Sequence, residues 1–328
     1  MKIVNNTLLL VFFFNGLFAQ AQDKVYLNED KQECEKEDAV YYRTIEELPA
    51  DENKLFLIKD YFISGQIQME GTFLSPETIY EHGEITWFYK NGNKKRKANY
   101  NQSLLLGDYL TWYENGEPKT IAEYIKNDFE ENRYSILKIQ AYWDTTGIQK
   151  VKEGNGIFFD DGNDHRTCEI LDCINKSYSE GPVVNGLKHG NWTGIEEEIG
   201  VTFQEVYLKG ILVEGKSVDQ EGNEYFYDKS RISPEPKKGF VSFYKYIRKK
   251  LRYPAAARKN KVEGKVFVQF IIDKNGDVTE SKVIQGIGYG CDEEAVKAIS
   301  EAPPWQPGKF KGKKVKMKMI LPITFRLG

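Results

Sequence analysis

Two patterns of hydrophobic and polar positions divide the chain. From about residue 65 to residue 227, short extended stretches rich in aromatic residues alternate with turns that contain glycine. Such stretches joined by Asn-Gly turns are typical of β-hairpins. After residue 240, apolar residues recur first at helical spacing and then at strand spacing. The chain is therefore expected to hold a long β-rich part followed by a smaller α+β part.

The β-rich part repeats one unit. The clearest copies are Trp-Phe-Tyr-Lys-Asn-Gly at 87–92 and Trp-Tyr-Glu-Asn-Gly at 112–116, and residues 142–147 form a weaker third. Asn-Gly suits the positive φ angles of a two-residue turn, so each copy predicts a hairpin with such a turn. One hairpin cannot bury its own apolar face, and we therefore expect several copies to stack into an extended sheet.

These units resemble MORN repeats, in the variant found in YwqK-type antitoxin-like proteins. They share its Tyr/Trp, its Asn-Gly and its following Gly-x-x-x-Gly. The resemblance implies a scaffold or binding surface without chemistry of its own. The aromatic residues are expected to serve as hairpin core, because large aromatic side chains dominate cores. This expectation covers Trp87, Trp112, Trp143 and Trp192.

The C-terminal part shows an ordered series of element signals. Phe243, Ile247 and Leu251 recur at helical spacing and predict a helix that ends before Tyr253-Pro254. A strand is expected from residue 264 to 272, a turn at 273–277 and a returning strand at 278–285. A second helix is expected from Asp292, whose side chain can cap free amides. A last strand is expected to run from the alternating residues 314–319 to Phe325. Helices on one face of a three-stranded antiparallel sheet follow.

Seven short motifs in this part, in order over nearly 80 residues, resemble the TonB C-terminal domain. They are residues 253–254, 263–266, 273–276, 292–296, 304–309, 312–315 and 321–325. The expected fold class is thus mixed. An N-terminal all-β array of MORN-like hairpin repeats precedes a small α+β TonB-like domain with a three-stranded antiparallel sheet and two helices.

The TonB resemblance also implies a task. The family's domain binds the TonB-box peptide of an outer-membrane transporter by adding it as a strand beside the last strand. An unpaired sheet edge can accept any extended peptide, and lysines along it also keep the edge from aggregating. The resemblance carries over these peptide-binding positions: Tyr253, Pro254, Lys314, Val315, Lys316, Met317, Lys318 and Met319.

The first residues predict export. Lys2 is followed by an apolar run at 8–18 and by Ala19-Gln20-Ala21, which suits signal-peptide cleavage after residue 21. The run is shorter than the roughly 20 residues that span a bilayer. A periplasmic protein with signal peptide 1–21 is expected. The alternative is an inner-membrane energy transducer coupled to ExbB/ExbD, although a repeat region stands where that family has a proline-rich spacer.

Charge divides the chain at the same place as the hydrophobic pattern. Residues 240–328 carry 19 Lys+Arg against 8 Asp+Glu, or +11, which leaves −14 for residues 1–239 of the net −3. The segment 233–239 holds two prolines and is expected to be a linker. It separates a repeat region at 22–232 from the TonB-like domain at 240–328. A solvated basic surface is one interpretation; a structural envelope protein that binds anionic cell wall, including peptidoglycan, or lipid is another.

Cysteine usage and motif content predict a non-enzymatic protein. In an oxidising compartment Cys168 and Cys173 are the expected disulfide, while Cys34 and Cys291 can be free, buried or bonded to each other. The glycine-rich segment 286–290 imitates a phosphate loop, but the acidic residues 292–294 would repel phosphate. No zinc, nucleophile-elbow or Cys-His motif is found in the sequence. No cofactor, metal or nucleic-acid partner is expected.

Overall fold

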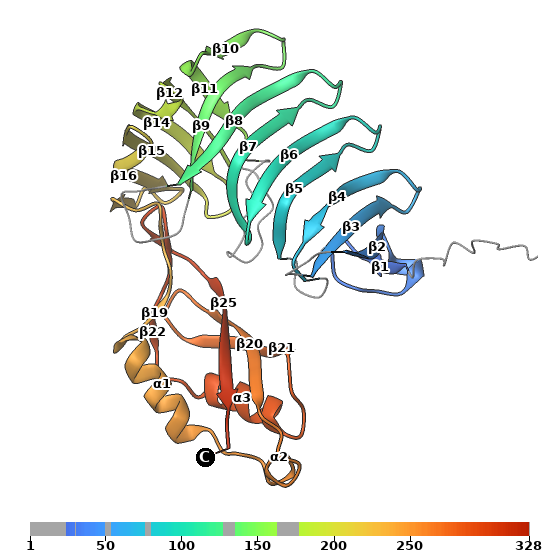
Figure 1. Ribbon diagram of the computed structural model, residues 1–328. Helices are drawn as coiled ribbons and strands as arrows, with labels where there is room; N and C mark the ends of the chain where they lie inside the picture. Colours follow the sequence, from blue (N-terminus) through green and yellow to red (C-terminus); the bar gives the residue numbers. More distant parts are fainter. Residues whose placement is uncertain are drawn as a thin grey trace, which may run out of the picture. The chain divides into compact units, whose positions relative to one another are not determined.

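The computed structural model describes residues 24–29, 31–49, 54–75, 80–126, 135–162 and 177–327 (Figure 1). The chain divides into two compact units, one of residues 1–93 and 100–103, the other of residues 94–99 and 104–328. The predicted signal peptide and the Cys168–Cys173 pair lie outside the described residues. Among the described helices, none has the length and apolar character needed to cross a membrane.

The first unit is an antiparallel meander. Each strand pairs with the next in the chain. Its core contains Ile58, Met69, Phe73 and Ile85. A buried Arg43 binds both carboxylate oxygens of Asp60, at 2.7 and 2.9 Å. The strands are β1 (Val25–Leu27), β2 (Tyr41–Leu48), β3 (Leu55–Phe62), β4 (Ile67–Phe73) and β5 (Glu81–Phe88), with a short 3-10 helix at Lys36–Asp38.

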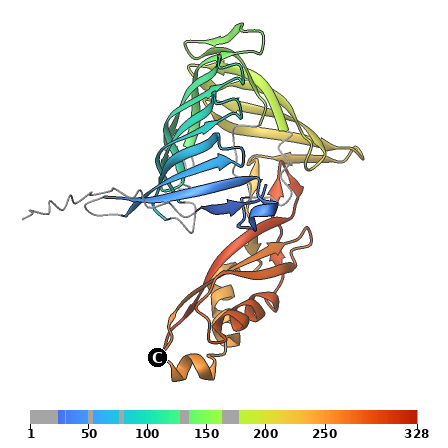
Figure 2. The same ribbon diagram turned by 90° about the vertical axis from the view of Figure 1, so that its right-hand side faces the viewer.

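The second unit begins with a longer array of the same kind, in which successive strands again pair antiparallel (Figure 2). Its strands are β7 (Leu104–Trp112), β8 (Pro118–Lys126), β9 (Ser135–Trp143), β10 (Gln149–Lys152), β11 (Asn155–Asp160), β12 (Ser177–Val184), β13 (Leu187–Lys188), β14 (Gly190–Glu196), β15 (Val201–Leu208), β16 (Ile211–Asp219) and β17 (Glu224–Tyr227). Strand β6 (Lys94–Asn101) is divided between the two units. The prediction of stacked antiparallel hairpins is confirmed.

The hairpin turns differ from the predicted two-residue type. At the second repeat, the Tyr113 N–H donates to the Glu117 carbonyl and the Gly116 N–H to the Tyr113 carbonyl, both at 2.9 Å. Only Gly116 has a positive φ, of 89°, while the Asn115 side chain accepts the Glu117 N–H at 3.0 Å. This is a three-residue loop, a type I turn closed by a left-handed glycine. The same backbone pattern occurs at 62–66, 89–93, 144–148, 219–223 and 273–277.

Glycines make room for large side chains on the buried face of the array. Gly194 lies opposite Phe203, and Gly215 lies opposite Tyr227. A Cβ added at these glycines would come within 2.3 and 2.2 Å of the facing rings. Trp192 covers a further glycine and is fully buried, as predicted for a core residue. The other three tryptophans of the repeats, Trp87, Trp112 and Trp143, are only half-buried.

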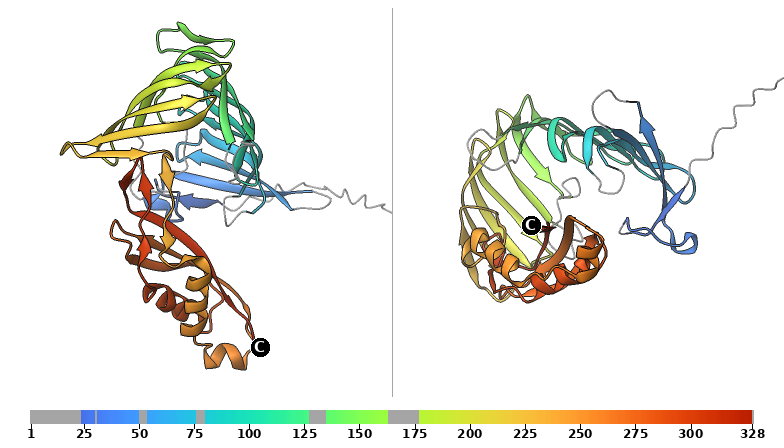
Figure 3. Two further views of the ribbon diagram at one scale, coloured as in Figure 1. Left: turned by 90° about the vertical axis from the view of Figure 1, so that its left-hand side faces the viewer. Right: turned by 60° about the horizontal axis from the view of Figure 1, so that its bottom comes forward.

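The C-terminal part of the second unit is the predicted α+β module. Its sheet has the order β21-β20-β25, and α1 and α3 pack on one face of it (Figure 3). Trp305, Phe270, Phe325 and Ile299 are fully buried in its core. The elements are α1 (Gly239–Lys250), α2 (Ala255–Lys259), β20 (Gly264–Ile272), β21 (Val278–Gln285), α3 (Cys291–Ser300) and β25 (Met317–Phe325).

Two details of this module depart from the sequence expectations. Helix α3 starts at Cys291 rather than at Asp292, and the Asp292 carboxylate accepts the N–H groups of Ile287 and Gly288 in the preceding loop. The proposed linker region also carries structure. Strand β18 (Arg231–Ile232) pairs with β23 (Lys309–Phe310), and β19 (Glu235–Pro236) pairs with β22 (Trp305–Gln306).

Candidate functional site

The last strand of the module has one unpaired edge. Strand β25 pairs with β20 along all nine of its residues, from Met317 opposite Ile272 to Phe325 opposite Gly264. Among the strands that the structure describes, none pairs with its other edge. Pro322 lies within β25, and proline is tolerated in edge strands because its missing N–H need not face a neighbour. Such an edge can accept a further strand.

The predicted contact residues near the start of β25 fall into two groups. Val315 and Met317 are buried, with 3% and 1% exposure, and Met319 packs against the core. Lys316 is exposed and Lys318 is half-buried. Lys314 belongs to the short strand β24 (Lys313–Lys314), not to β25. The side chains of the apolar residues thus serve the core, and these positions can offer a partner only their backbone.

Tyr253 and Pro254 lie elsewhere. The Tyr253 ring packs edge-to-face on Phe325, with centroids 5.7 Å apart, and its hydroxyl donates to the Val262 carbonyl. Phe325 ends β25, and a nine-residue strand spans about 27 Å at about 3.4 Å per residue. Tyr253 therefore lies at the far end of the strand from Met317. The structure does not bring the predicted residues together at one place.

A hairpin that sequence reasoning did not single out joins the module to the array. Residues 309–314, here called the docked hairpin, consist of β23, a two-residue turn and β24. The turn residues Lys311 and Gly312 both have positive φ, of 46° and 79°, which is the geometry of a tight β-hairpin turn. The Lys311 N–H donates to the Ser230 carbonyl at 2.6 Å.

Lys311 enters the end of the array and is only 7% exposed. Its Nζ lies 2.7 Å from Glu205 Oε1 and 3.4 Å from the ring centre of Phe203. Its carbonyl accepts the hydroxyl of the fully buried Ser217 at 2.7 Å. The charge and the carbonyl of this residue are therefore satisfied by strands β15 and β16.

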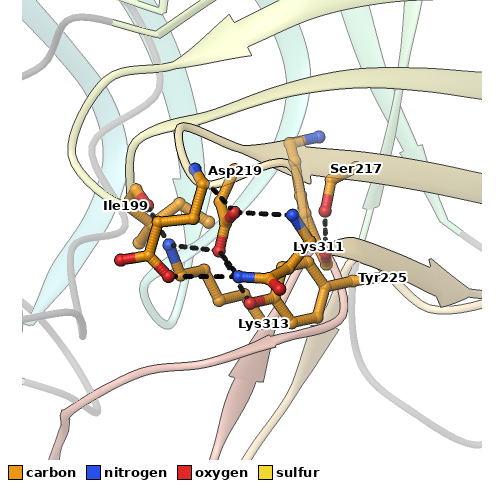
Figure 4. Close-up of polar contacts among 8 residues, drawn as sticks. Ile199, Ser217, Asp219, Tyr225, Lys311 and Lys313 are labelled. Carbon is orange, nitrogen blue, oxygen red and sulfur yellow. Dashed lines mark hydrogen bonds and ion pairs between the residues drawn. The ribbon is translucent and has the colours of Figure 1, made fainter.

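Lys313 provides a second contact between the docked hairpin and the array (Figure 4). Its Nζ donates to the Ile199 carbonyl at 3.0 Å and lies 3.5 Å from Asp219 Oδ2. The Tyr225 hydroxyl donates to the same oxygen at 2.8 Å. Burial alone would raise the pKa of Asp219, but hydrogen bonds from Tyr225 and Asn223 lower it. The carboxylate stays ionised and available to Lys313.

Glu205 is the acidic centre of the docking. It is 3% exposed and accepts the hydroxyls of Tyr207 and Tyr227 at 3.0 and 2.9 Å. Burial would raise the pKa of Glu205, but the charge of Lys311 and hydrogen bonds from Lys311 and Tyr227 outweigh it and lower the pKa. Removing one partner of such a buried ion pair is strongly destabilising, because the other charge is then buried without compensation. No sequence pattern indicates this ion pair, because the two residues are 106 positions apart.

Glu196, at the end of β14, should make stability depend on pH. Burial raises the pKa of its carboxyl from 4.5 to about 7, although Lys311 acts to lower it. The folded chain then binds the proton more tightly than the unfolded chain, so stability is full below pH 4.5 and falls as pH rises through 7.

Replacing Glu196 by Gln should remove this pH dependence. At pH 8 the variant should be more stable than the native chain by on the order of 2 kcal/mol, since one pKa unit corresponds to about 1.4 kcal/mol. Urea unfolding at pH 5 and pH 8 measures the difference, and the exposed Glu214, changed to Gln, is the control. Equal pH profiles for native chain and variant would show that the carboxyl is not held neutral.

The described residues offer no metal site or phosphate loop. Among them, no group of three or more His, Cys, Asp or Glu side chains is placed to hold a metal ion. The amides of Ile287 and Gly288, which a phosphate would need, already bind Asp292. Cys34 and the buried Cys291 are both free, which resolves the alternatives left open for them.

Comparison with known proteins identifies the module. Residues 249–327 match the family model of the Gram-negative bacterial TonB protein C-terminal. A search of curated proteins found no match. The family match confirms the resemblance on which the C-terminal expectations rest and supports a TonB-like envelope protein in TonB-dependent processes. The family's domain serves transduction and interaction rather than catalysis. The MORN resemblance of the preceding strands stays a prediction.

Proposed function

We propose that this chain is a non-enzymatic periplasmic protein whose TonB-like module binds an extended segment of an envelope partner beside β25. The partner segment is the TonB box of an outer-membrane transporter. The unpaired edge of β25 is the observation that carries the proposal, and the family match gives it a class of partner. Backbone donors and acceptors along an open edge bind any extended chain, and side chains next to the edge select among sequences.

The proposed binding relies on backbone at residues 316–319 and on a few side chains. Ile320 is 48% exposed, and Lys316 is also exposed. A hydrophobic side chain beside cations suits a segment in which apolar and acidic residues alternate, because a strand presents alternate residues to the same face.

The array contributes a fixed support in this proposal. The docked hairpin buries Lys311 against β15, so the module and the end of the array hold one another through a charged and a backbone contact. A proline-rich spacer lets a binding module extend away from its anchor, whereas the docked hairpin holds this module in one orientation on the array. The array is therefore proposed as a scaffold that presents the β25 edge. Tyr253 and Pro254 are proposed as a support for the distal end of β25, not as peptide contacts.

Hydrogen exchange with a synthetic peptide tests the proposal. The probe is a set of peptides copied from the N-terminal segments of outer-membrane transporters of the same organism. We expect slower amide exchange in residues 317–325 on binding, and no change in β21, the opposite edge of the same sheet. Methylating alternate backbone nitrogens of the peptide should weaken binding at least tenfold in one register and little in the other, since a strand donates hydrogen bonds to a neighbour only from alternate residues.

Equal affinity of both methylated peptides, or protection on β21 instead of β25, would contradict strand addition at this edge. The energy transducer and the cell-wall protein are the alternatives. Co-purification with ExbB/ExbD would favour the first of these. Salt-sensitive binding to purified cell wall without any peptide binding would favour the second.

A further inference from the structure

Helix α1 and the residues that flank it carry positive charge and no acidic side chain. Residues 237–252 contain seven Lys and Arg residues and no Asp or Glu. The first turn of the helix has no acidic residue to neutralise them, although such residues are favoured there. Seven like charges in sixteen positions repel one another, and this repulsion raises the free energy of the folded protein. Binding to an anionic partner would reduce the repulsion.

The charges are gathered on the outer face of the helix. Phe243 and Ile247 face the core and are 4% exposed. At 100° per residue the opposite face of the helix is formed by Val241, Lys245, Arg248 and Lys249, all of them exposed, and the exposed Lys238 and Arg252 flank the two ends of the helix. These residues, here called the α1 outer face, are Lys238, Val241, Lys245, Arg248, Lys249 and Arg252.

None of these cations is used inside the described part of the chain. Lys250, which lies on the side toward the core, pairs with Glu301 at 3.6 Å. Within the described residues, the five cations of the α1 outer face form no ion pair. They differ in this from Lys311 and Lys313 of the docked hairpin, which form ion pairs with Glu205 and Asp219.

An apolar group stands among the cations. Val241 is 86% exposed, the highest value of any large hydrophobic residue on the described surface. Phe240 and Tyr244 beside it are both 39% exposed and pack against one another with ring centroids 6.4 Å apart. A polyanion in water would need the charges alone. A bilayer interface takes both, with cations at the headgroups and apolar and aromatic side chains at the acyl boundary.

We propose that the α1 outer face binds the surface of an anionic phospholipid bilayer. Lysine and arginine side chains bind the headgroup phosphates, and Val241 with the edges of Phe240 and Tyr244 inserts below them. This contact goes beyond the proposed peptide binding and uses a different element, so the two functions can fail independently. A helix lying on the membrane surface would set the distance at which the β25 edge meets its partner.

Vesicle co-sedimentation of the full chain tests the contact. The probes are vesicles of phosphatidylcholine alone and vesicles with about one third phosphatidylglycerol. We expect binding only to the second kind, falling steeply with salt. The variant Lys245→Glu/Arg248→Glu/Arg252→Glu should lose at least about 100-fold in partition coefficient, since each charge near an anionic surface contributes about fivefold. Every variant carries the same N-terminus, so its contribution to binding is common to all.

The control variant has the same change in net charge on other elements. Lys274, Lys282 and Lys297 are exposed and lie in the turn before β21, in β21 and in α3. Changing these three to Glu should lower vesicle binding less than about fivefold, because distant exposed charges are screened at physiological salt. If this variant loses as much as the α1 variant, net charge rather than a built surface binds the vesicle, and the proposal is wrong.

A neutral substitution separates a bilayer from a soluble polyanion. Val241→Ser should weaken binding to phosphatidylglycerol vesicles about threefold to tenfold through lost apolar burial. It should leave binding to dextran sulfate unchanged. If Val241→Ser binds the vesicles as well as the native chain does, the α1 outer face is a general polyanion surface, and anionic cell-wall polymer takes the place of lipid.

Discussion

Replacing Lys311 by Met is expected to destabilise the docked hairpin by about 3 to 5 kcal/mol, because the change leaves Glu205 buried and charged without its partner. The Met side chain preserves most of the volume over Phe203, so lost packing contributes little. Hydrogen exchange of residues 309–314 is the direct measurement, since the Lys311 amide is bound to the Ser230 carbonyl. A loss of this size accelerates exchange by more than a hundredfold.

Two further variants make the result specific. Lys316→Met removes an exposed cation five residues away and should leave the exchange of the docked hairpin within about 0.5 kcal/mol of the native value. Lys311→Met/Glu205→Gln removes both charges, and the Gln amide can accept one of the two tyrosine hydroxyls with its oxygen and donate to the other from its NH2 group. The double variant should regain most of the loss. If it is as unstable as the single variant, the ion pair is not what holds the hairpin.

The two acidic residues near Lys311 give the docking opposite pH dependences. The pKa of Glu205 is lowered, so its contribution is present above 4.5 and is lost as pH falls through its folded value. The pKa of Glu196 is raised to about 7, so its neutral form is favoured and stability falls as pH rises through that value. The docking should accordingly be most stable between these limits, in mildly acidic solution.

The C-terminal module could be predicted from the sequence because its signals are local. Phe243 and Ile247 mark one face of a helix, and Val266, Val268 and Phe270 mark one face of a strand. These periods are fixed by backbone geometry and do not depend on distant contacts. The same reasoning could not assign the turns. Asn115-Gly116 suits a two-residue turn, whereas the structure forms a three-residue loop in which the Asn115 side chain accepts the Glu117 amide.

The site was predictable in topology but not in side chains. An edge position for the last strand follows from the order of the elements and the family resemblance. The alternation along residues 314–319 correctly separates the lysines from the apolar residues. It does not show whether the apolar side chains are buried in the core or are open to a bound peptide. The structure covers Val315 and Met317. The contact of the docked hairpin could not be predicted from the sequence. Lys311 belongs to a run of lysines that is typical of an exposed surface, and only the fold brings Glu205 next to it.

The role of the glycines on the buried face of the array could not be predicted from the sequence either. Substitution of one of them, Gly215, is the second change for which we expect a large effect. In Gly215→Ala the new Cβ would lie 2.2 Å from Cε2 of Tyr227, closer than any real contact, so the ring must move. The Tyr227 hydroxyl then loses Glu205, 2.9 Å away in the native chain. Overpacking costs about 1 to 3 kcal/mol. Loss of a hydrogen bond to a charged group adds about 2 kcal/mol, for a total of about 3 to 5 kcal/mol.

Replacing Tyr227 on the facing strand by a smaller residue tests whether the destabilisation by Gly215→Ala is steric. Gly215 does not have a positive φ, so alanine is compatible with its backbone and the whole cost should come from the ring. Gly215→Ala/Tyr227→Leu should therefore be more stable than Gly215→Ala, although Tyr227→Leu alone destabilises. Val213→Ala, two residues away at an exposed position, should cost little in urea unfolding. Because Glu205 also binds Lys311, Gly215→Ala should accelerate amide exchange in the docked hairpin as well. Destabilisation of the array without that acceleration would mean that the glycine serves strand packing alone and has no part in holding the module.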